Sequence, residues 1–370
     1  MNDNISSTSA SNESRVASPW NNVDDLITYE TFQKFNLYVQ CLIKPLVLLV
    51  GVPSNVVNCV VFWRQGLRDR MNLCLFCLSL TDLLYLILVF VQTVIGPFVE
   101  FVDILLGKEI YYKCVVYSGW VSQELRLLSG CISLVIGVER CVCVLLPLRA
   151  VSLISSRTMG LLLCSVYVIT QLGFVTSLMS FQVIAVLDSK TSKVLYWTTA
   201  PTDALKNYRS LFNIIQRVLL ETVLPVSIFV VLSITTGITV ARLKAAMLWR
   251  EQTSSKGSDD NRGQQVALTR MLVLVSVVYI ITALPYIAYT LVAVFVPEFN
   301  FGGKYQNSLF LVALISTVCS MINGSFNVFI YYRQSSRYRA VLQTLCCSNS
   351  HDKQKSLNCD TTVTSFVSKT

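Results

Sequence analysis

Histidine and charge are both scarce in this chain. Its only histidine, His351, lies in a polar tail, which excludes mechanisms that need a histidine inside the fold, among them Ser-His-Asp hydrolysis and histidine-ligated metal sites. Charged residues make up only 14% of the 370 residues, whereas a typical globular domain carries about 25%. Hydrophobic residues make up 53%, which is more than a soluble core of this size can bury. We therefore predict a membrane protein.

Seven apolar runs are long enough to cross a bilayer as helices, which takes about 20 residues each. They lie near residues 38–63, 71–98, 112–145, 158–187, 211–241, 269–297 and 307–332. Alternating segments of about ten residues, which would indicate a membrane β-barrel, do not occur. The pattern predicts an all-α membrane protein built as a seven-transmembrane helix bundle.

The polar N-terminal segment helps to orient this bundle. It carries two glycosylation sequons, at Asn4 and Asn12, although such triplets also arise by chance. If it lies outside, the inner segments hold eighteen basic and seven acidic residues, and the outer segments ten basic and eleven acidic ones. This is the positive-inside bias of a chain with its N-terminus outside and its C-terminus inside. Because the basic residues are spread over short loops, we expect no nucleic acid partner.

Short motifs occur in a fixed order through the seven runs. They are Gly51 and Asn55 in the first, Asp82 in the second, Glu139 and Arg140 in the third with Pro147 after it, Pro225 in the fifth, Pro285 in the sixth, and Asn327 and Tyr331 in the seventh. Together they resemble the rhodopsin-like (class A) family of G-protein-coupled receptors, over roughly residues 37–347. The amino-acid sequence of the loop at residues 62–70 further resembles that of molluscan chemosensory-type and neuropeptide-type receptors.

The resemblance implies a multi-pass receptor of the plasma membrane. Such a receptor binds an extracellular ligand, a peptide or a small chemosensory molecule, and activates a heterotrimeric G protein. Receptor kinases and arrestin are the further partners that it implies. It implies no enzymatic activity and no cofactor other than a possible Na⁺ ion.

These patterns divide the chain into four parts. They are a disordered, glycosylated extracellular N-terminus (1–36), the seven-helix receptor domain (37–332), a short amphipathic eighth helix (333–347), and a disordered Ser/Thr-rich cytoplasmic tail (348–370). Tyr338, Leu342 and Leu345 lie on one apolar face of the eighth helix, so we expect it to lie on the inner leaflet. Cys346 and Cys347 follow it as palmitoylation candidates, with plain free thiols as the alternative.

Asp82 lies in the middle of the second run, where an isolated charge costs at least a few kcal/mol and needs partners. The resemblance places Ser129, Asn323 and Asn327 around it, as a sodium or water site. A protonated, hydrogen-bonded aspartate with no ion is the alternative.

Arg140 ends the third run next to Glu139. The resemblance implies that the two form an ion pair at rest and that release of this pair frees the guanidinium for a G protein. Asn327 and Tyr331 belong to the same activation machinery in the family. A lone arginine reaching from a helix end toward the membrane surface is the alternative.

The chain departs from the family pattern at several positions. Ala283 stands where the family usually has a tryptophan that moves on activation, and Val328 replaces a proline. Cys114 sits one residue further from Arg140 than the family's extracellular cysteine, and the loop 188–210, which should hold its partner, contains no cysteine. Cys114 is then unpaired, or pairs with Cys41.

Charged residues inside the membrane are functional candidates by default. At about 100° per residue, Arg126 lies within about 40° of the face of Arg140 and about 21 Å further out along the third helix. Arg217, Glu221 and Pro225 recur every four residues in the fifth run, so an α-helix would place them on one stripe.

The resemblance implies that both stripes face the ligand cavity, with Gln123 and Tyr286 as neighbours. Two inward arginines suit a ligand with a carboxylate, a phosphate or an acidic peptide group. An internal Arg–Glu pair that only holds the helices together is the alternative. Ser122 stands where amine receptors hold an aspartate, and Met321 where opsins hold their retinal lysine, so neither ligand is favoured.

Two other classes of membrane protein compete with a receptor. A transporter or channel would show an internal repeat and several Gly-interrupted helices, and no repeat is evident. An intramembrane hydrolase would need a Ser–His pair or paired aspartates, and Asp82 is the only aspartate deep in a run.

Overall fold

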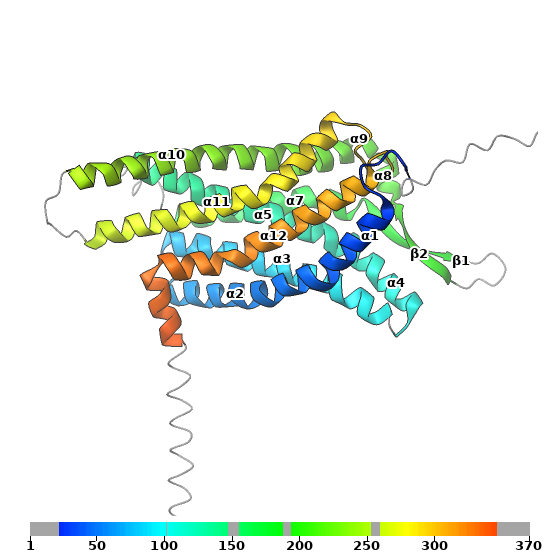
Figure 1. Cartoon of the computed structure of the whole chain (residues 1–370), viewed down its shortest axis with the longest axis horizontal. Coiled ribbons are helices and arrows are strands. Elements are labelled where there is room, and N and C mark those ends of the chain that lie inside the picture. Colours follow the sequence, from blue (N-terminus) through cyan, green and yellow to red (C-terminus); the bar gives the residue numbers. More distant parts are fainter. Residues whose placement is uncertain (1–21, 101, 147–154, 188–193, 253–259, 346–370) are drawn as a thin grey trace, which may run out of the picture.

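The computed structural model describes residues 22–100, 102–146, 155–187, 194–252 and 260–345. Seven of its helical segments are long and apolar enough to cross a membrane, as the sequence predicted. They span Tyr29–Gln65, Arg70–Glu100, Ile104–Leu145, Ser156–Leu178, Arg209–Leu248, Val266–Phe295 and Gln306–Gln334. The helices run side by side along the long axis of the molecule (Figure 1).

Several of these spans consist of more than one helical element. In chain order, the elements are α1 (Tyr29–Tyr38), η2 (Val39–Ile43), α2 (Lys44–Gln65), α3 (Arg70–Glu100), α4 (Ile104–Lys113), η3 (Cys114–Ser118), α5 (Gly119–Leu145), α7 (Ser156–Leu178), β1 (Phe181–Leu187), β2 (Val194–Pro201), α8 (Asp203–Asn207), α9 (Arg209–Phe212), η4 (Asn213–Val223), α10 (Leu224–Gln252), α11 (Asp260–Phe295) and α12 (Gln306–Gln334). The three η elements are π-helical and interrupt otherwise α-helical spans.

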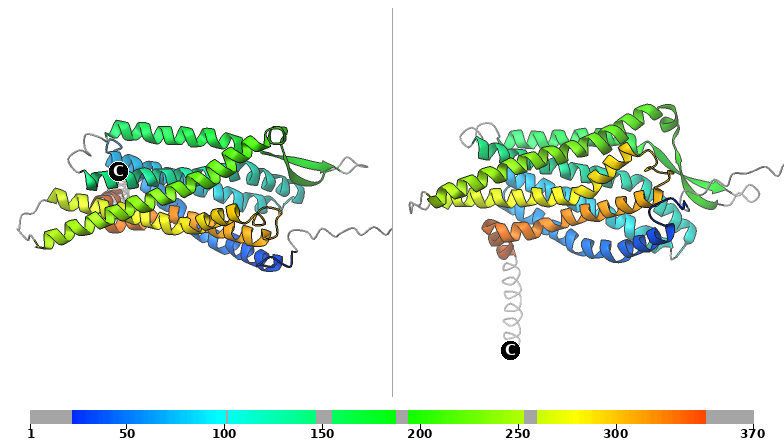
Figure 2. Two further views of the ribbon diagram at one scale, coloured as in Figure 1. Left: turned by 90° about the horizontal axis from the view of Figure 1, so that it is seen from above. Right: turned by 45° about the horizontal axis from the view of Figure 1, so that its top comes forward.

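The third span forms the centre of the bundle. Its most apolar window is 67% buried, against 17–50% for the other spans. Its helix α5 packs against α3, α7, α10 and α11, and Figure 2 shows the helices of the bundle side by side in two further views. Residues on α5 are therefore placed to contact both a central cavity and several neighbouring helices.

Glycine allows the first and seventh spans to come into close contact. A Cβ atom on Gly51 would lie 2.1 Å from Oγ of Ser325, so a larger residue has no room. Beside it, the Asn55 amide donates to the Gly324 carbonyl at 2.7 Å and to the Gly51 carbonyl at 3.0 Å. The Gly51–Asn55 motif thus joins α2 to α12.

The fourth span is shorter than the sequence predicted, because residues 181–187 form a strand. Strand β1 pairs antiparallel with β2, with Phe181 opposite Pro201. The prediction of a helix to residue 187 was wrong, since a short apolar run does not distinguish helix from strand by periodicity. Its Val and Ile residues favour the strand. The hairpin lies at the same end of the molecule as α1 (Figure 1).

The N-terminal boundary also differs from the prediction. Helix α1 begins at Tyr29, where the Thr28 hydroxyl accepts a hydrogen bond from the Thr31 amide, so residues 29–36 are helical and not disordered. Just before it, the Asp25 carboxylate accepts hydrogen bonds from the Asn307 amide at 2.7 Å and the Ser308 hydroxyl at 2.5 Å. Asp25 therefore caps the start of α12, whose own N-cap residue offers no side-chain bond.

After α12 the chain turns sharply, and residues 336–345 are helical (Figure 1). Tyr338 is buried there, its ring 5.8 Å from both Phe62 and Tyr331, and its hydroxyl donates to Asn58 at 2.7 Å. Burial raises the pKa of Tyr338, so the hydroxyl stays protonated as a donor. Asn4, Asn12, Pro147, Cys346, Cys347 and the tail from residue 348 lie outside the described residues.

Candidate functional site

Glu139 anchors a charged cluster at one end of the bundle. Its side chain is 1% exposed and binds Nε and Nη2 of Arg140, the latter at 2.6 Å. Arg70, the first residue of α3, adds a contact from its Nε at 2.9 Å. The Cys143 thiol also donates to Glu139, at 3.3 Å. The carboxylate is therefore neutralised from two helices.

Arg70 was not anticipated as part of this cluster. In the sequence it is one of several basic residues near the start of the second run, and nothing in its spacing indicates a contact with the third run. Asn327 and Tyr331, the other residues expected to act with Arg140, lie on α12. Tyr331 is fully buried in edge contact with Phe62, with 5.1 Å between ring centroids.

Asp82 has neutral partners instead. It is 2% exposed, and it accepts hydrogen bonds from the Ser129 hydroxyl at 2.7 Å and the Asn327 amide at 3.1 Å. Asn323 lines the cavity that Asp82 also borders. Of the three residues expected around this carboxylate, Ser129 and Asn327 bind it and Asn323 lies in the wall of the same cavity.

The donor set at Asp82 is made of oxygen atoms, which hard cations prefer as ligands. Oδ1 of Asn327 is buried and has no hydrogen-bond partner in the described part of the chain, so it adds an unused acceptor beside the carboxylate. Within the same residues, no group of three or more His, Cys, Asp or Glu side chains gathers as a metal site. The residues fit a singly charged cation better than a divalent metal.

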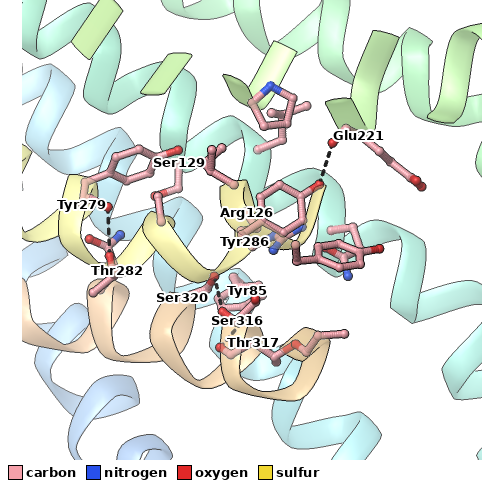
Figure 3. Close-up of a pocket in the computed structure, with 18 of the residues that line it drawn as sticks. Tyr85, Arg126, Ser129, Glu221, Tyr279, Thr282, Tyr286, Ser316, Thr317 and Ser320 are labelled. Carbon is pink, nitrogen blue, oxygen red and sulfur yellow. Dashed lines mark hydrogen bonds between the residues drawn. The ribbon is translucent and has the colours of Figure 1, made fainter. Parts of the chain in front are cut away.

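A cavity of about 350 Å³ lies between α3, α5, α10, α11 and α12. It is bordered by the predicted residues Gln123, Arg126, Glu221 and Tyr286, and it extends to Ser129 and Asp82. Figure 3 shows Arg126, Tyr286 and Glu221 near one end and Ser129 with Tyr279 near the other. Its size is in the range of small-molecule pockets, which hold about 300–1,000 Å³.

Arg126 is the main positive charge in this cavity. Its guanidinium carbon lies 3.8 Å from the centroid of the Tyr286 ring, in a cation–π contact. The Tyr286 hydroxyl donates to the Glu221 main-chain carbonyl at 3.0 Å. Arg126 forms no ion pair with an acid among the described residues, although the Glu221 carboxylate is close enough to interact with it electrostatically.

Arg217 does not join this cavity, which corrects the predicted stripe. Residues 213–223 form the π-helix η4, in which main-chain hydrogen bonds run from residue i to i+5. Glu221 borders the cavity, whereas Arg217 is not among the residues that line it. The Arg217 side chain is exposed and donates to Asn300 in the loop before α12.

A protein-family model described as "7 transmembrane receptor (rhodopsin family)" matches residues 54–331, more than half of the chain. The chain belongs to the rhodopsin family of seven-transmembrane receptors. A search of curated proteins found no match. Members of this family are membrane receptors that bind extracellular ligands and couple to G proteins, so the predicted receptor class is confirmed. Nothing in the match supports the transporter or channel alternative.

The hairpin of this receptor is held without a disulfide to α5 or its extension. Cys41 and Cys114 are both free thiols, as the missing loop cysteine suggested. Instead, Nζ of Lys113, the residue before Cys114, lies 5.6 Å from the centroid of the Trp197 ring on β2. At the base of the hairpin, the Thr202 hydroxyl donates to the Met179 carbonyl at 2.5 Å.

Ala283 lies in the wall of the receptor's cavity, next to Thr282. Because the alanine side chain is a single methyl group, it fills much less of the cavity than the tryptophan that the family resemblance implies at this position. Nearby, Tyr279 occupies space that only a glycine leaves open, since a Cβ atom on Gly130 would lie 2.3 Å from the Tyr279 hydroxyl oxygen. Gly130 thus makes room for the Tyr279 ring, which itself lines the cavity.

Proposed function

We propose that this receptor lies in the plasma membrane with its N-terminus outside and activates a heterotrimeric G protein. The observation that carries the proposal is the buried Glu139–Arg140 pair at the end of the central helix, on the basic side of the chain. Arg140 can leave this pair without leaving Glu139 uncompensated, because Arg70 remains bound to it. Release of Arg140 on activation therefore costs less than breaking an isolated buried pair.

The ligand that suits the cavity carries an acidic or strongly hydrogen-bond-accepting group, on a peptide or a small molecule. Arg126 supports this, because a guanidinium without an ion-paired acid in a cavity inside the bundle is costly until an anion or water meets it. Gln123, Glu221 and Tyr286 are neighbours that can orient such a group. Arg217 contributes at the rim at most, since it binds Asn300.

Asp82, Ser129, Asn323 and Asn327 are the residues that would hold a Na⁺ ion in the resting receptor. When bound, such an ion neutralises the carboxylate and links α3, α5 and α12. The unpartnered Oδ1 of Asn327 supports this assignment.

Several segments outside or beside the bundle complete the proposal. Residues 336–345 would lie on the inner leaflet, followed by palmitoylation at Cys346 and Cys347. Glycans on Asn4 and Asn12 would mark the extracellular side, and phosphorylation of the Ser/Thr-rich tail by receptor kinases would recruit arrestin. The sequence of the loop at residues 62–70 further suggests a receptor of the molluscan chemosensory or neuropeptide type.

The test is the variant Arg140→Ala, measured by guanine-nucleotide exchange on purified G-protein heterotrimers and by surface labelling of cells. We expect normal surface expression and loss of exchange. Arg337→Ala is the matched control, because it removes an exposed inner arginine outside the cluster. Full exchange by Arg140→Ala at normal expression would contradict G-protein coupling through this residue.

A further inference from the structure

One cavity is bordered by the Arg126 guanidinium and by two carboxyl groups, those of Glu221 and Asp82. Arg126 borders it in the outer part of α5, and Asp82 borders it one helical turn further in, through its partner Ser129. Three residues separate Arg126 from Ser129, which corresponds to about 4.5 Å along the helix axis. The ligand site and the Asp82 site are therefore two ends of the same space.

Ala283 is the reason that the two ends are continuous. It borders the cavity with only a methyl group, and the cavity wall on the neighbouring helix α12 includes the small side chains of Ser316, Thr317 and Ser320 (Figure 3). Each of these hydroxyls donates to a carbonyl one turn back in α12, so the wall is compact and presents oxygen acceptors. Nothing among the cavity-lining residues divides the outer part from the inner part.

Neither charge is neutralised by an ion pair. In the described part of the chain, no acid forms a salt bridge with Arg126 and no base forms one with Asp82. Two opposite, partly desolvated charges at the ends of one small cavity are costly alone, and a molecule that carries both complementary charges removes that cost.

We propose that the ligand is a small zwitterion, with its acidic group on Arg126 and its ammonium group reaching past Ala283 to Asp82. The inference rests on the proposed receptor function and names its ligand class. An ammonium group has three donors and no acceptor, and the oxygens of Asp82, Ser129 and Asn327 offer matching acceptors. The volume of about 350 Å³ accommodates a compact molecule and not a folded peptide.

A consequence is that sodium and the ligand compete directly. Both would use the Asp82 carboxylate, so Na⁺ acts on the ligand's own binding site. A ligand with only an acidic group would instead bind at Arg126 while sodium stays in place.

The experiment measures the unfolding temperature of the full-length receptor in lipid nanodiscs with defined probes. The probes are ω-aminocarboxylates from aminobutanoate to aminooctanoate, together with the carboxylate and the alkylamine of each length. We expect one chain length to bind at least about tenfold more tightly than its matched carboxylate and alkylamine, as expected for adding a charge-assisted hydrogen bond. Replacing choline by Na⁺ in the buffer should weaken the binding of the zwitterion and leave the binding of the carboxylate unchanged.

Variants separate the two ends of the cavity. Ala283→Trp, and Ala283→Leu as a smaller change that is easier to fold, should abolish the advantage of the zwitterion over the carboxylate, while Ala283→Ser retains it. Asp82→Asn should abolish the same advantage, and Arg126→Gln should weaken both probes.

The inference is overturned if zwitterion and carboxylate bind equally well to the wild-type receptor, if no probe of the series binds, or if both large Ala283 variants keep the advantage. If binding is lost only in Arg126→Gln, the proposed site for an acidic group is supported, and the proposed contact of an ammonium group with Asp82 is overturned. The nucleotide-exchange test of Arg140→Ala is independent of all these results, so failure of the receptor proposal is recognised separately.

Discussion

Glu139 and Asp82 are two carboxylates with the same exposure, 2% each, and very different surroundings. Glu139 binds two guanidinium groups and a thiol. Asp82 binds one hydroxyl and one amide and borders a cavity. Burial alone therefore does not decide what a membrane carboxylate does. A carboxylate with charged partners holds helices together, and one with neutral partners stays available to a mobile cation.

The two arginines of α5 show the same contrast. Arg140 lies against a carboxylate, whereas Arg126 lies against the face of an aromatic ring. An ion pair and a cation–π contact both accommodate the charge, but only the second leaves the guanidinium edge free for a ligand acceptor. Substitutions at the first site should therefore change stability, and substitutions at the second should change ligand response.

The largest effect is expected for Glu139→Ala. It leaves Arg140 buried without an acid, and breaking a buried pair in this way costs about 3–5 kcal/mol. We expect about 3 kcal/mol, since the side chain of Arg70 retains 21% exposure and can turn to solvent. Thermal unfolding in nanodiscs measures the loss. Glu109→Ala is the matched control, because its pair with Lys113 is more exposed and such pairs contribute about 0–1 kcal/mol. Equal losses in both variants would contradict the special status of the Glu139 cluster.

Arg126→Gln should act on ligand response instead. Loss of a charge-assisted hydrogen bond should reduce agonist potency at least about tenfold, with an unfolding temperature equal to or above that of the wild type. Dose–response curves of nucleotide exchange measure potency. Arg217→Gln is the control and should remain near wild type, because this side chain is exposed and binds Asn300. A destabilised Arg126→Gln receptor with unchanged potency would mean that Arg126 only holds helices together.

Asp82→Asn should remove the effect of sodium. Coupling between two bound ligands is typically 5–150-fold, and we expect agonist potency in the wild type to differ at least about fivefold between Na⁺ and choline buffers. In Asp82→Asn the two curves should coincide. Glu221→Gln, which changes another carboxylate of the same cavity, should keep the difference. A sodium effect that survives in Asp82→Asn would place the ion elsewhere.

The smallest effect is expected for Asp25→Ala. The Asp25 carboxylate accepts hydrogen bonds from Asn307 and Ser308 near the surface of the protein. The substitution removes two hydrogen bonds at the start of α12, and loss of a helix cap costs about 1 kcal/mol. The neighbouring Asp24→Ala is the control. Its ion pair with Lys304, at 3.4 Å, is exposed, so its smaller effect should vanish at high salt. Thermal unfolding at two salt concentrations distinguishes them, and identical behaviour of the two variants would contradict the cap.

Prediction from the sequence succeeded where all the residues that make up a feature lie on one helix. The seven spans follow from the length of apolar runs, and Glu139 and Arg140 are adjacent in the chain. The grouping of Asp82 with Ser129 and Asn327 came from the family resemblance, because no periodicity relates residues on three different helices.

The failures have physical causes too. Arg70 contacts Glu139 across helices, and a basic residue near a helix start has the same appearance whether it faces solvent or a carboxylate. The Arg217–Glu221 stripe was expected to face the cavity as a whole, but only Glu221 borders it, because the exposed Arg217 side chain binds Asn300. The strand at residues 181–187 was read as helix because its apolar run continues that of α7 without a break in hydropathy.

The short π-helix η3 also explains an irregular spacing in the sequence. It covers Cys114–Ser118, so it begins at the cysteine that lies one residue too far from Arg140 for the family pattern. A π-turn closes over five residues where an α-turn closes over four, and so it takes in one additional residue without ending the helix. Helix η3 is therefore where one additional residue is accommodated, and the residues from Gly119 to Arg140 keep α-helical phase. Comparison of this receptor with its relatives by counting residues from Arg140 is therefore sound as far as Gly119 and needs a gap of one residue beyond it.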